Sequence, residues 1–378
     1  MGEWKEYKLG EIAEILDYKR KPLSSMQRSV RKGKIPYYGA SGIIDYIDDY
    51  IFEGEHVLIS EDGENLRSRQ TPIAFLADGK FWVNNHAHII KSDYIHNRLI
   101  CYYFSNLDLN PFLTGAVQPK LSQDSLKRIP IFLPQSIDDR KQIVSVISSL
   151  DDKIDLLYRE NKTLEAMAET LFRKWFIEEA KEDWKEGTLD DILFVKGGTT
   201  PSTKESKYWN GNISWTSPKD ITTLNGIYLF DTERKITQEG LKQISSGLLP
   251  AGTLLMSSRA PVGVLAYAEI PLAINQGYIA IIDDKGYAKE FIYLWLKANM
   301  DMVHSYANGS TFMEISKSAF KSLGLQIPPK HIVAEFCRGI KPIFEKIKIN
   351  ELQIRTINRT RDNILPKLMS NEIKIDEL

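Results

Sequence analysis

The sequence has little of what extracellular and membrane proteins contain. It has only two cysteines in 378 residues, Cys101 and Cys337, and they lie in different halves. They exclude a disulfide framework and a cysteine-type zinc site, and their scarcity is typical of a reducing compartment. No apolar run approaches the ~20 residues of a membrane span, and residues 1–7 lack the apolar core of a signal peptide. We therefore expect a cytoplasmic protein without membrane contact.

An excess of positive charge is also missing, because 49 lysines and arginines are offset by 50 acidic residues. Phosphate neutralisation supplies much of the affinity of DNA-binding proteins, so a net charge of −1 argues against tight autonomous binding to DNA. It is compatible with local basic patches or with a partner that supplies charge. The hydrophobic content of 43% is ordinary for a soluble chain of two or three domains.

Motifs of catalysis are missing as well. Without a Walker phosphate loop, the chain is not expected to be an ATP-driven motor, and no Gly-x-Gly-x-x-Gly segment marks an S-adenosylmethionine site. The segment 110–112 (Asn-Pro-Phe) has only part of the Asn-Pro-Pro-aromatic motif of adenine methyltransferases, so a loop turn is favoured. His86 and His88 would share one face of a strand, and Asp78 or His96 could complete a metal site. No spacing enforces that site, so we predict core or surface histidines and no catalytic residue, cofactor or metal.

What the sequence does contain is an internal repeat. Trp4-Lys5-Glu6 recurs as Trp184-Lys185-Glu186. Farther along, an offset of 194 relates Gly115, Ser122, Leu126 and Pro134 to Gly309, Ser316, Phe320 and Pro328. Because the offset grows from 180 to 194, the insertions lie inside the globular parts while the frame is kept. A duplicated frame around two divergent bodies suggests a reader of two sites rather than one active site.

Each half is predicted to fold as a mixed α/β body. Short apolar runs bounded by turn residues predict strands in the first half at 56–60, 73–76, 81–83, 87–90 and 129–134, with a short helix at 98–106. The same order in the second half predicts strands at 253–256, 272–276, 279–282 and 325–328, with a helix at 290–299.

A long amphipathic helix follows each body. Its apolar residues alternate in spacings of 3 and 4, and such a repeat held for four or more heptads predicts a coiled-coil seam rather than a single core helix. The seam residues are Ile143, Ile147, Leu150, Ile154, Leu157, Asn161, Leu164 and Leu171 in the first helix, and Phe336, Ile340, Ile343, Ile347, Asn350, Ile354, Ile357 and Ile364 in the second.

Two polar features interrupt these helices. Asn161 and Asn350 each stand in a seam, where an asparagine helps to fix register and partner; the alternative is a solvent-facing position near a frayed seam. Pro366 is expected to terminate or kink the second helix. The seam from Ile143 to Leu171 would span roughly 42 Å at ~1.5 Å per residue. That length suits a spacer between two DNA half-sites, which lie roughly 34–36 Å apart when separated by one turn.

Several motifs now resemble a known family. Gly197-Gly198-Thr199-Thr200-Pro201-Ser202, followed in order by segments 208–221, 257–263 and 273–277, resembles the target-recognition domain of Type I restriction-modification specificity (S) subunits. Segments 327–329 and 364–368 are similar to the family's second conserved region. The first half matches more loosely, and its body lacks the Gly-Gly-Thr-Pro opening. The two domains are therefore expected to belong to different recognition subfamilies and to read different sequences.

The resemblance implies an α+β fold, in which two long antiparallel coiled-coil helices separate two mixed α/β target-recognition domains in a pseudo-twofold repeat. The expected boundaries are 1–135 for recognition domain 1, 136–181 for helix 1, 182–328 for recognition domain 2 and 329–378 for helix 2. It implies a non-catalytic subunit that reads an asymmetric, bipartite site in double-stranded DNA. The helices would set the spacing and bind two modification (M) subunits. S-adenosylmethionine, ATP and Mg would belong to those M subunits and to motor-nuclease (R) subunits.

Two groups of residues are candidates for DNA contact. The segment 19–34 holds basic residues and no acid, which predicts a phosphate-contacting arm, with a solvated loop as the alternative. In this half the candidates are Lys19, Arg20, Lys21, Arg28, Arg31, Lys32, Lys34, Arg67 and Arg69. In the second half they surround the glycine loop and two later turns: Lys196, Thr199, Thr200, Ser202, Lys204, Lys207, Ser258, Arg259, Ser310 and Thr311.

Some alternatives stay open at this point. The aromatic residues Tyr208, Trp209 and Trp215 are predicted to be core residues that hold the glycine loop rather than base contacts. Arg259 has an internal salt bridge as its alternative role. For the whole chain, a stand-alone adenine methyltransferase and a coiled-coil adaptor without a DNA role are the other two functions. Binding of S-adenosylmethionine by the isolated chain would favour the methyltransferase.

Overall fold

The computed structural model describes residues 3–115, 118–259, 261–309 and 313–373, and its chain divides into two compact units. Unit 1 comprises Met1–Ile154 and Thr356–Leu378, and unit 2 comprises Asp155–Arg355. Each unit therefore combines one globular body with the adjoining parts of both long helices. Among the described residues, no helix is both long and apolar enough to cross a membrane.

Unit 1 is built on two small four-stranded sheets. One sheet has the order β2-β9-β6-β7 and is antiparallel; its strands are Glu14–Ile15, Ala87–Lys91, His56–Ser60 and Ala74–Ala77. The other has the order β4-β3-β8-β5, with strands Gly42–Ile47, Lys32–Gly39, Lys80–Val83 and Phe52–Glu53, and β3 runs parallel to β8. The entry strand β1 (Trp4–Lys8) pairs with the exit strand β12 (Pro130–Pro134), and β10 (Leu113–Thr114) pairs with β11 (Lys120–Leu121).

The helices of unit 1 are short except for α4. They are α1 (Leu9–Ile12), α2 (Ser25–Ser29), α3 (Asn65–Ser68), α4 (Tyr94–Asn106) and α5 (Gln123–Arg128), with 3-10 turns η1 (Asp17–Lys19) and η2 (Asn110–Phe112). The carboxylate of Asp93 caps α4 by accepting from the His96 N–H group at 2.8 Å, so this helix begins four residues before the predicted one. All five residues of β6 are buried, which explains why its apolar run was easy to recognise.

Unit 2 repeats this arrangement with insertions. Its larger sheet has the order β14-β21-β18-β19-β16, with strands Phe194–Lys196, Tyr278–Asp283, Thr253–Ser257, Leu265–Ala268 and Tyr228–Leu229. Its second sheet has the order β17-β15-β20, with strands Arg234–Ile236, Trp209–Thr216 and Leu272–Ile274, and β13 (Lys185–Thr188) pairs with β22 (Gly324–Ile327). The helices are α7 (Leu189–Ile192), α8 (Pro218–Thr222), α9 (Gln238–Leu241), α10 (Lys289–Ala298), α11 (Met300–Ser305) and α12 (Lys317–Lys321), with the 3-10 turn η4 (Ser206–Tyr208).

The internal repeat is confirmed at the level of individual hydrogen-bonded pairs. Ser60 lies opposite Ala87 in unit 1, and Ser257 lies opposite Tyr278 in unit 2. The entry and exit strands pair antiparallel in both units. Among the residues of unit 1 that the structure describes, no strand corresponds to β16, so β16 is an insertion that enlarges the second body.

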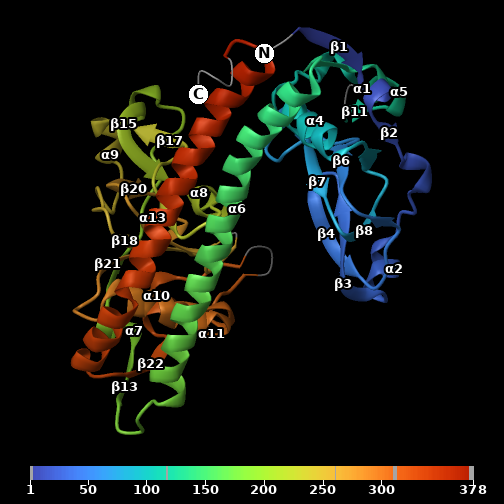
Figure 1. The fold of residues 1–378 in the computed structure, drawn as a ribbon. Coiled ribbons are helices and arrows are strands. Elements are labelled where there is room, and N and C mark those ends of the chain that lie inside the picture. The colour runs from blue at the N-terminus through green and yellow to red at the C-terminus, as the bar shows by residue number, and fades with distance from the viewer. Residues whose placement is uncertain (1–2, 116–117, 260, 310–312, 374–378) are drawn as a thin grey trace. The chain divides into compact units, whose positions relative to one another are not determined.

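The two long helices are α6 (Ile137–Arg173), which continues into a π-helical turn η3 (Lys174–Glu178), and α13 (Lys330–Met369). They lie side by side and antiparallel (Figure 1, green and red). In unit 2, Phe172 meets Phe336 near one end and Asn161 meets Asn350 farther along, which fixes the direction. Every predicted seam residue is buried or half-buried. Asn161 and Asn350 are 5% and 0% exposed, so they do not face solvent.

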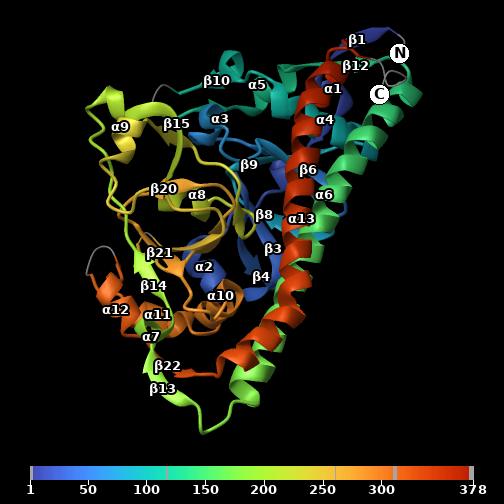
Figure 2. The same cartoon turned by 90° about the vertical axis from the view of Figure 1, so that its left-hand side faces the viewer.

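The expectation that Pro366 terminates or kinks the second helix fails for termination, since helix α13 does not stop at Pro366 but continues to Met369. A second proline, Pro342, stands inside the same helix. There the ring conflicts with the carbonyl of Arg338, and in Figure 2 the orange start of α13 bends away from its later part. Flanking buried residues such as Phe336 and Phe344 hold the helix together across this point.

Candidate nucleic-acid interface

The basic segment 19–34 is folded rather than a free loop, which corrects the sequence interpretation. It comprises the end of η1, helix α2 capped by the Ser24 hydroxyl, and the start of β3. Pairing of β3 with β4 brings acidic residues to it: Asp45 contacts Arg28 and Lys32 at 3.1 and 2.8 Å, and Asp48 and Asp49 contact Arg31. The hydrogen bond from Lys32 lowers the pKa of Asp45 to about 2. The acids were missed because they follow in sequence, at 45–49.

Three cations of this segment keep their charge available. Lys19, Lys21 and Lys34 are exposed, and no carboxylate of the described residues forms an ion pair with them within 4.0 Å. The indole of Trp82 donates to the Lys21 carbonyl at 2.6 Å, and the Arg31 guanidinium lies over the same ring. The backbone at Lys21 is therefore held by a buried residue of β8.

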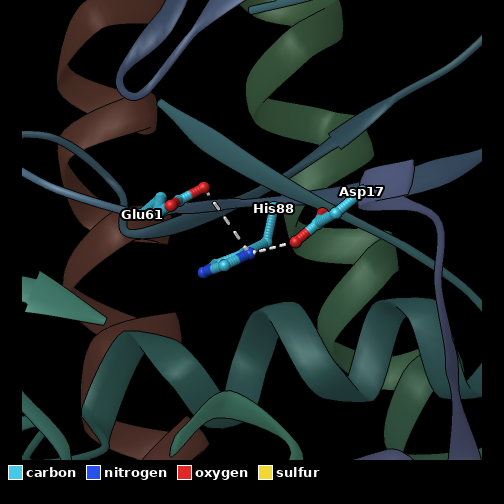
Figure 3. A group of neighbouring side chains, drawn as sticks. All are labelled: Asp17, Glu61 and His88. Carbon is cyan, nitrogen blue, oxygen red and sulfur yellow. Dashed lines mark hydrogen bonds and ion pairs between the residues drawn. The ribbon is translucent and has the colours of Figure 1, made fainter. Parts of the chain in front are cut away.

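Arg20 has a different role from its neighbours, because it enters a buried ion network. Asp17, Glu61 and His88 converge with ligand-type atoms within 4.8 Å of one another (Figure 3). The imidazole Nδ1 of His88 lies 2.6 Å from Asp17, and its Nε2 lies 2.8 Å from the Leu121 carbonyl. Arg20 ion-pairs with Asp17 at 3.4 Å and with Glu61 at 2.5 Å.

The charges in this cluster are thus compensated within the chain. Burial alone would raise the pKa of Asp17, but the hydrogen bond and charge of His88, with Arg20, lower it. For Glu61, burial is likewise outweighed by Arg20 and His88, and its pKa is lowered. A cation would have to displace the guanidinium, so the cluster is suited to holding η1, β6 and β9 together. His86 contacts Asp62 instead, and His96 contacts Asp93, so the metal grouping considered from the sequence does not assemble.

Arg67 and Arg69, which follow β6, also differ in whether the guanidinium group is bound inside the chain or exposed. Arg69 adopts a left-handed backbone (φ 50°) and donates to the carbonyls of Phe104, Ser105 and Leu107, which end helix α4. Its side chain therefore caps the C-terminus of that helix. Arg67 is exposed in the last turn of α3.

In unit 2, the glycine loop is locked to the sheet beneath it. A Cβ on Gly198 would lie 1.8 Å from the carbonyl oxygen of Ile274, so only glycine permits this approach. The indole of Trp209 donates to the Ser202 carbonyl at 3.0 Å, and that of Trp215 to the Thr199 carbonyl at 3.4 Å. Both rings are buried, which confirms that they are core residues that hold the loop, whereas Tyr208 is only half-buried.

The hydroxyls of the loop point to a neighbouring segment and to one exposed amide. Thr199 donates to the Gln243 carbonyl at 2.7 Å, and Thr200 donates to Oε1 of Gln276 at 2.7 Å. Lys196 reaches the carbonyl of Ser246 at 3.3 Å. The three remaining candidates, Ser202, Lys204 and Lys207, are exposed, and Lys207 has a solvent-exposed ion pair with Glu205.

An isolated backbone β-bridge occurs at the corresponding place in both units, and the residues that form it have opposite charges in the two units. Asp62 pairs with Lys120 in unit 1, and Arg259 pairs with Glu314 in unit 2. The side chains of Arg259 and Glu314 also form a loose ion pair at 4.0 Å. Ser258, which corresponds to Glu61, is buried, and its hydroxyl has no hydrogen-bond partner among the residues described. Ser310 and Thr311 lie outside the described residues.

Each body is attached to the long helices within its own unit by a carboxylate. In unit 1, Asp151 of α6 accepts from the Tyr102 hydroxyl at 3.0 Å and pairs with Arg361 of α13 at 2.8 Å. In unit 2, Glu351 of α13 accepts from the N–H groups of Ile227 and Tyr228 at 2.8 and 3.1 Å. Burial raises the pKa of Glu351 to about 7, although these two hydrogen bonds oppose the rise.

Comparison with known proteins assigns this architecture. Residues 1–166 and 181–359 match the family model of the Type I restriction modification DNA specificity domain. The chain belongs to this family. Membership identifies it as a specificity (S) subunit, which is a non-catalytic class of subunit.

Individual relatives agree with this assignment. The specificity subunit of the Type I restriction enzyme MjaIX from Methanocaldococcus jannaschii is 38% identical over 162 residues, 42% of this chain and 38% of that protein. The HindI specificity subunit of Haemophilus influenzae is 21% identical across 99% of this chain and 100% of that protein. The match thus spans under two fifths of the first relative and the whole of the second.

A solved structure supports the fold. The S subunit from M. genitalium superposes with a TM-score of 0.59 at 14% identity, covering 97% of this chain and 96% of that one. At this identity the likeness concerns the fold alone. The S-subunit fold of two sheet-based bodies and two packed helices, expected from the sequence, is confirmed.

Proposed function

We propose that this S subunit reads a bipartite, asymmetric site in double-stranded DNA, with one half-site for each recognition domain, 1–135 and 182–328. The observation that carries the proposal is the pair of matched bridges. The same frame presents Asp62 and Lys120 in one unit but Arg259 and Glu314 in the other. Since sequence is read by side chains that meet base edges, equal scaffolds with opposite charges are suited to different half-sites.

Within unit 1, the exposed Lys19, Lys21 and Lys34 are our proposed phosphate contacts, and Arg67 is a further candidate. Arg20 and Arg69 are proposed to support the surface from within, because their guanidinium groups bind internal acceptors. In unit 2, Lys196, Lys204, Lys207 and Arg259 supply the positive charge around the glycine loop. The chain's net charge of −1 fits a subunit whose affinity for DNA depends on partners.

We further propose that segments 136–181 and 329–378 bind two M subunits, with R subunits joining the complex. Both helices expose apolar side chains in unit 2: Leu156 and Met167 on α6, and Ile349 and Leu352 on α13, each 42–58% exposed. Exposed apolar residues on a helix that already buries its seam are suited to a second helical partner. S-adenosylmethionine, ATP and Mg would be held by the partners.

The direct test is methylation by the complex of this chain with its M subunits. We expect adenine methylation at one split, non-palindromic site, and weak DNA binding with no methyl transfer by the chain alone. Methyl transfer by the isolated chain would support a stand-alone methyltransferase instead. Unchanged DNA binding of the complex after reversing the charges of Lys19, Lys21 and Lys34 would favour an adaptor.

The spacer role of the helices has its own test. Because α6 and α13 are antiparallel partners, one heptad must be removed from each to keep their seam in register. We expect the gap between the half-sites to shrink, since seven residues span roughly 10 Å at ~1.5 Å per residue. An unchanged gap between the half-sites would show that the helices do not set their spacing.

A further inference from the structure

An identical turn connects the second sheet to the first in both units. In unit 1, the side-chain oxygen of Asn84 accepts from the His86 N–H at 2.8 Å, and the Asn84 N–H donates to Tyr38. In unit 2, Asn275 does the same with Gly277 at 2.8 Å and with Thr216. Asn84 and Asn275 are each 9% exposed, so both turns are held from below by a buried asparagine.

The residue at the tip of each turn is an exposed carboxamide, Asn85 in unit 1 and Gln276 in unit 2. Neither residue is among those with a positive φ, so the turn does not require an amide at its tip. The neighbouring positions differ in the two units, with His86 replaced by Gly277 and Ala87 by Tyr278. The shared amide at the tip is therefore not explained by the backbone.

In unit 1, the backbone of the turn is braced by the ion network of Figure 3. Nη1 of Arg20 donates to the carbonyls of Asn85 and Ala87 at 3.3 and 3.0 Å and to the Glu61 carboxylate at 2.5 Å. The N–H group of Glu61 itself donates to the His86 carbonyl at 2.9 Å. The tip is thus fixed on both sides, and the Asn85 side chain is left free of internal hydrogen bonds among the described residues.

In unit 2, the glycine loop supplies the brace. The Thr200 hydroxyl donates to Oε1 of Gln276 at 2.7 Å, and the Ser258 N–H donates to the Gly277 carbonyl at 2.8 Å. Gln276 is one methylene longer than Asn85 and would lose more rotamer freedom on binding, so Thr200 compensates by orienting it. One lone pair of Oε1 and both amide N–H donors remain for a ligand.

We propose that Asn85 and Gln276 are specificity-determining residues, each of which reads an adenine edge in the half-site of its own unit. A carboxamide suits adenine because its oxygen accepts from the N6 amino group while its nitrogen donates to N7. The inference rests on the proposed function, since it needs DNA on this face of each recognition domain. It gives one base contact of the same chemistry to two bodies that otherwise differ.

The test uses the complex with M subunits and maps methylated sites across a DNA library. Asn85→Ala is expected to relax one base position in one half-site, and Gln276→Ala one position in the other, each by roughly 5- to 150-fold in discrimination. Gln135→Ala and Gln326→Ala, which remove exposed amides at the exit strands, should leave both half-sites unchanged. Thermal unfolding of all four variants should match the native chain, because the amides are exposed.

Two conservative variants separate base recognition by hydrogen bonds from the effect of side-chain size. Asn85→Asp and Gln276→Glu keep the size of the side chain but leave only acceptors, so preference at the same positions should move from adenine towards cytosine, whose N4 amino group donates. Unchanged half-sites in all of these variants, beside a native complex that methylates a split site, would overturn the inference. If the native complex methylates no split site, the proposed function fails first.

Discussion

The isolated backbone β-bridge that occurs in each body, next to the central strand β6 or β18, shows what the repeat conserves and what it changes. The backbone pairing of Asp62 with Lys120 is reproduced by Arg259 with Glu314, but each charge is inverted. Beside them, the buried acid Glu61 is replaced by Ser258, and His88 of the ion network is replaced by Ile279. Hydrogen bonds of the main chain define the frame, so side chains at its rim can change sign without altering it. Recognition can therefore diverge while the scaffold stays the same.

The two units also differ in how they support their rims. Unit 1 uses a buried network of charges around Arg20, whereas unit 2 uses close backbone contact at Gly198 and the tryptophans of β15. The attachment to the long helices differs likewise. Asp151 has a cationic partner in Arg361, while Glu351 accepts from backbone N–H groups and has the carboxylates of Glu165 and Glu269 nearby. A substitution that removes a supporting contact in one unit should therefore leave the other unit intact.

The largest expected effect concerns Glu351 and pH. Its pKa is raised to about 7 from the ordinary 4.5, so the folded chain holds this proton more tightly than the unfolded chain. The resulting stabilisation is complete below pH 4.5 and is lost as the pH rises through 7, by up to about 3 kcal/mol. Denaturant unfolding can be measured for the native chain and for Glu351→Gln from pH 4.5 to 8. The difference between their free energies of unfolding should change over this pH window. A constant difference would contradict the shift.

A substitution at Gly198 should disable one reader and spare the other. Gly198→Val forces a side chain into the Ile274 carbonyl and should cost about 1–3 kcal/mol of stability. Recognition should be lost in one half-site only, as measured by mapping methylated sites. Gly197→Ala is the control, because the atoms nearest to its Cβ would belong to the flexible end of the Lys317 side chain, at 3.2 Å and beyond. Equal loss from both variants would mean that the close approach is not what matters.

The lysines of unit 1 should report on phosphate contact through salt. Substituting Lys19, Lys21 and Lys34 by alanine should flatten the slope of log affinity against log salt by about 0.9 for each phosphate contact removed. Lys32→Ala should change the slope less, since its charge is already paired with Asp45 at 2.8 Å. Equilibrium binding of the complex at several salt concentrations measures both. A slope that falls equally in the two cases would show that internal pairing does not exclude Lys32 from DNA.

The frame could be predicted from the sequence because its signals are local. A repeat of 3.5 residues identified the seam from Ile143 onward, and buried apolar runs such as β6 identified central strands. Strand β3 was missed because it contains Gly33 and Pro36, which rarely occur in strands. Pairing with β4 overrides them through a register shift after Lys32.

The chemistry of the rim was harder to predict because it depends on distant partners. Arg20 and Arg28 both belong to one basic segment of the sequence. In the structure, Arg20 binds Glu61, which directly follows β6, whereas Arg28 binds Asp45 of β4. Pro342 shows the same limit within a helix, since only tertiary packing lets α13 continue past it. The amides Asn85 and Gln276 could have been found by aligning the two halves residue by residue after the central strands.

The smallest expected effect lies in the seam, which both halves share. Asn350 donates to Asn161 at 2.8 Å and to Glu160 at 3.0 Å, while its own side-chain oxygen is buried without a partner in the described structure. Substituting either asparagine by alanine leaves a buried amide less well satisfied, whereas the double substitution removes both groups. Denaturant unfolding of the two single variants and the double variant should therefore give a coupling of about 1 kcal/mol. Additive single effects would mean that the pair does not act as a unit, and that register depends on the apolar seam alone.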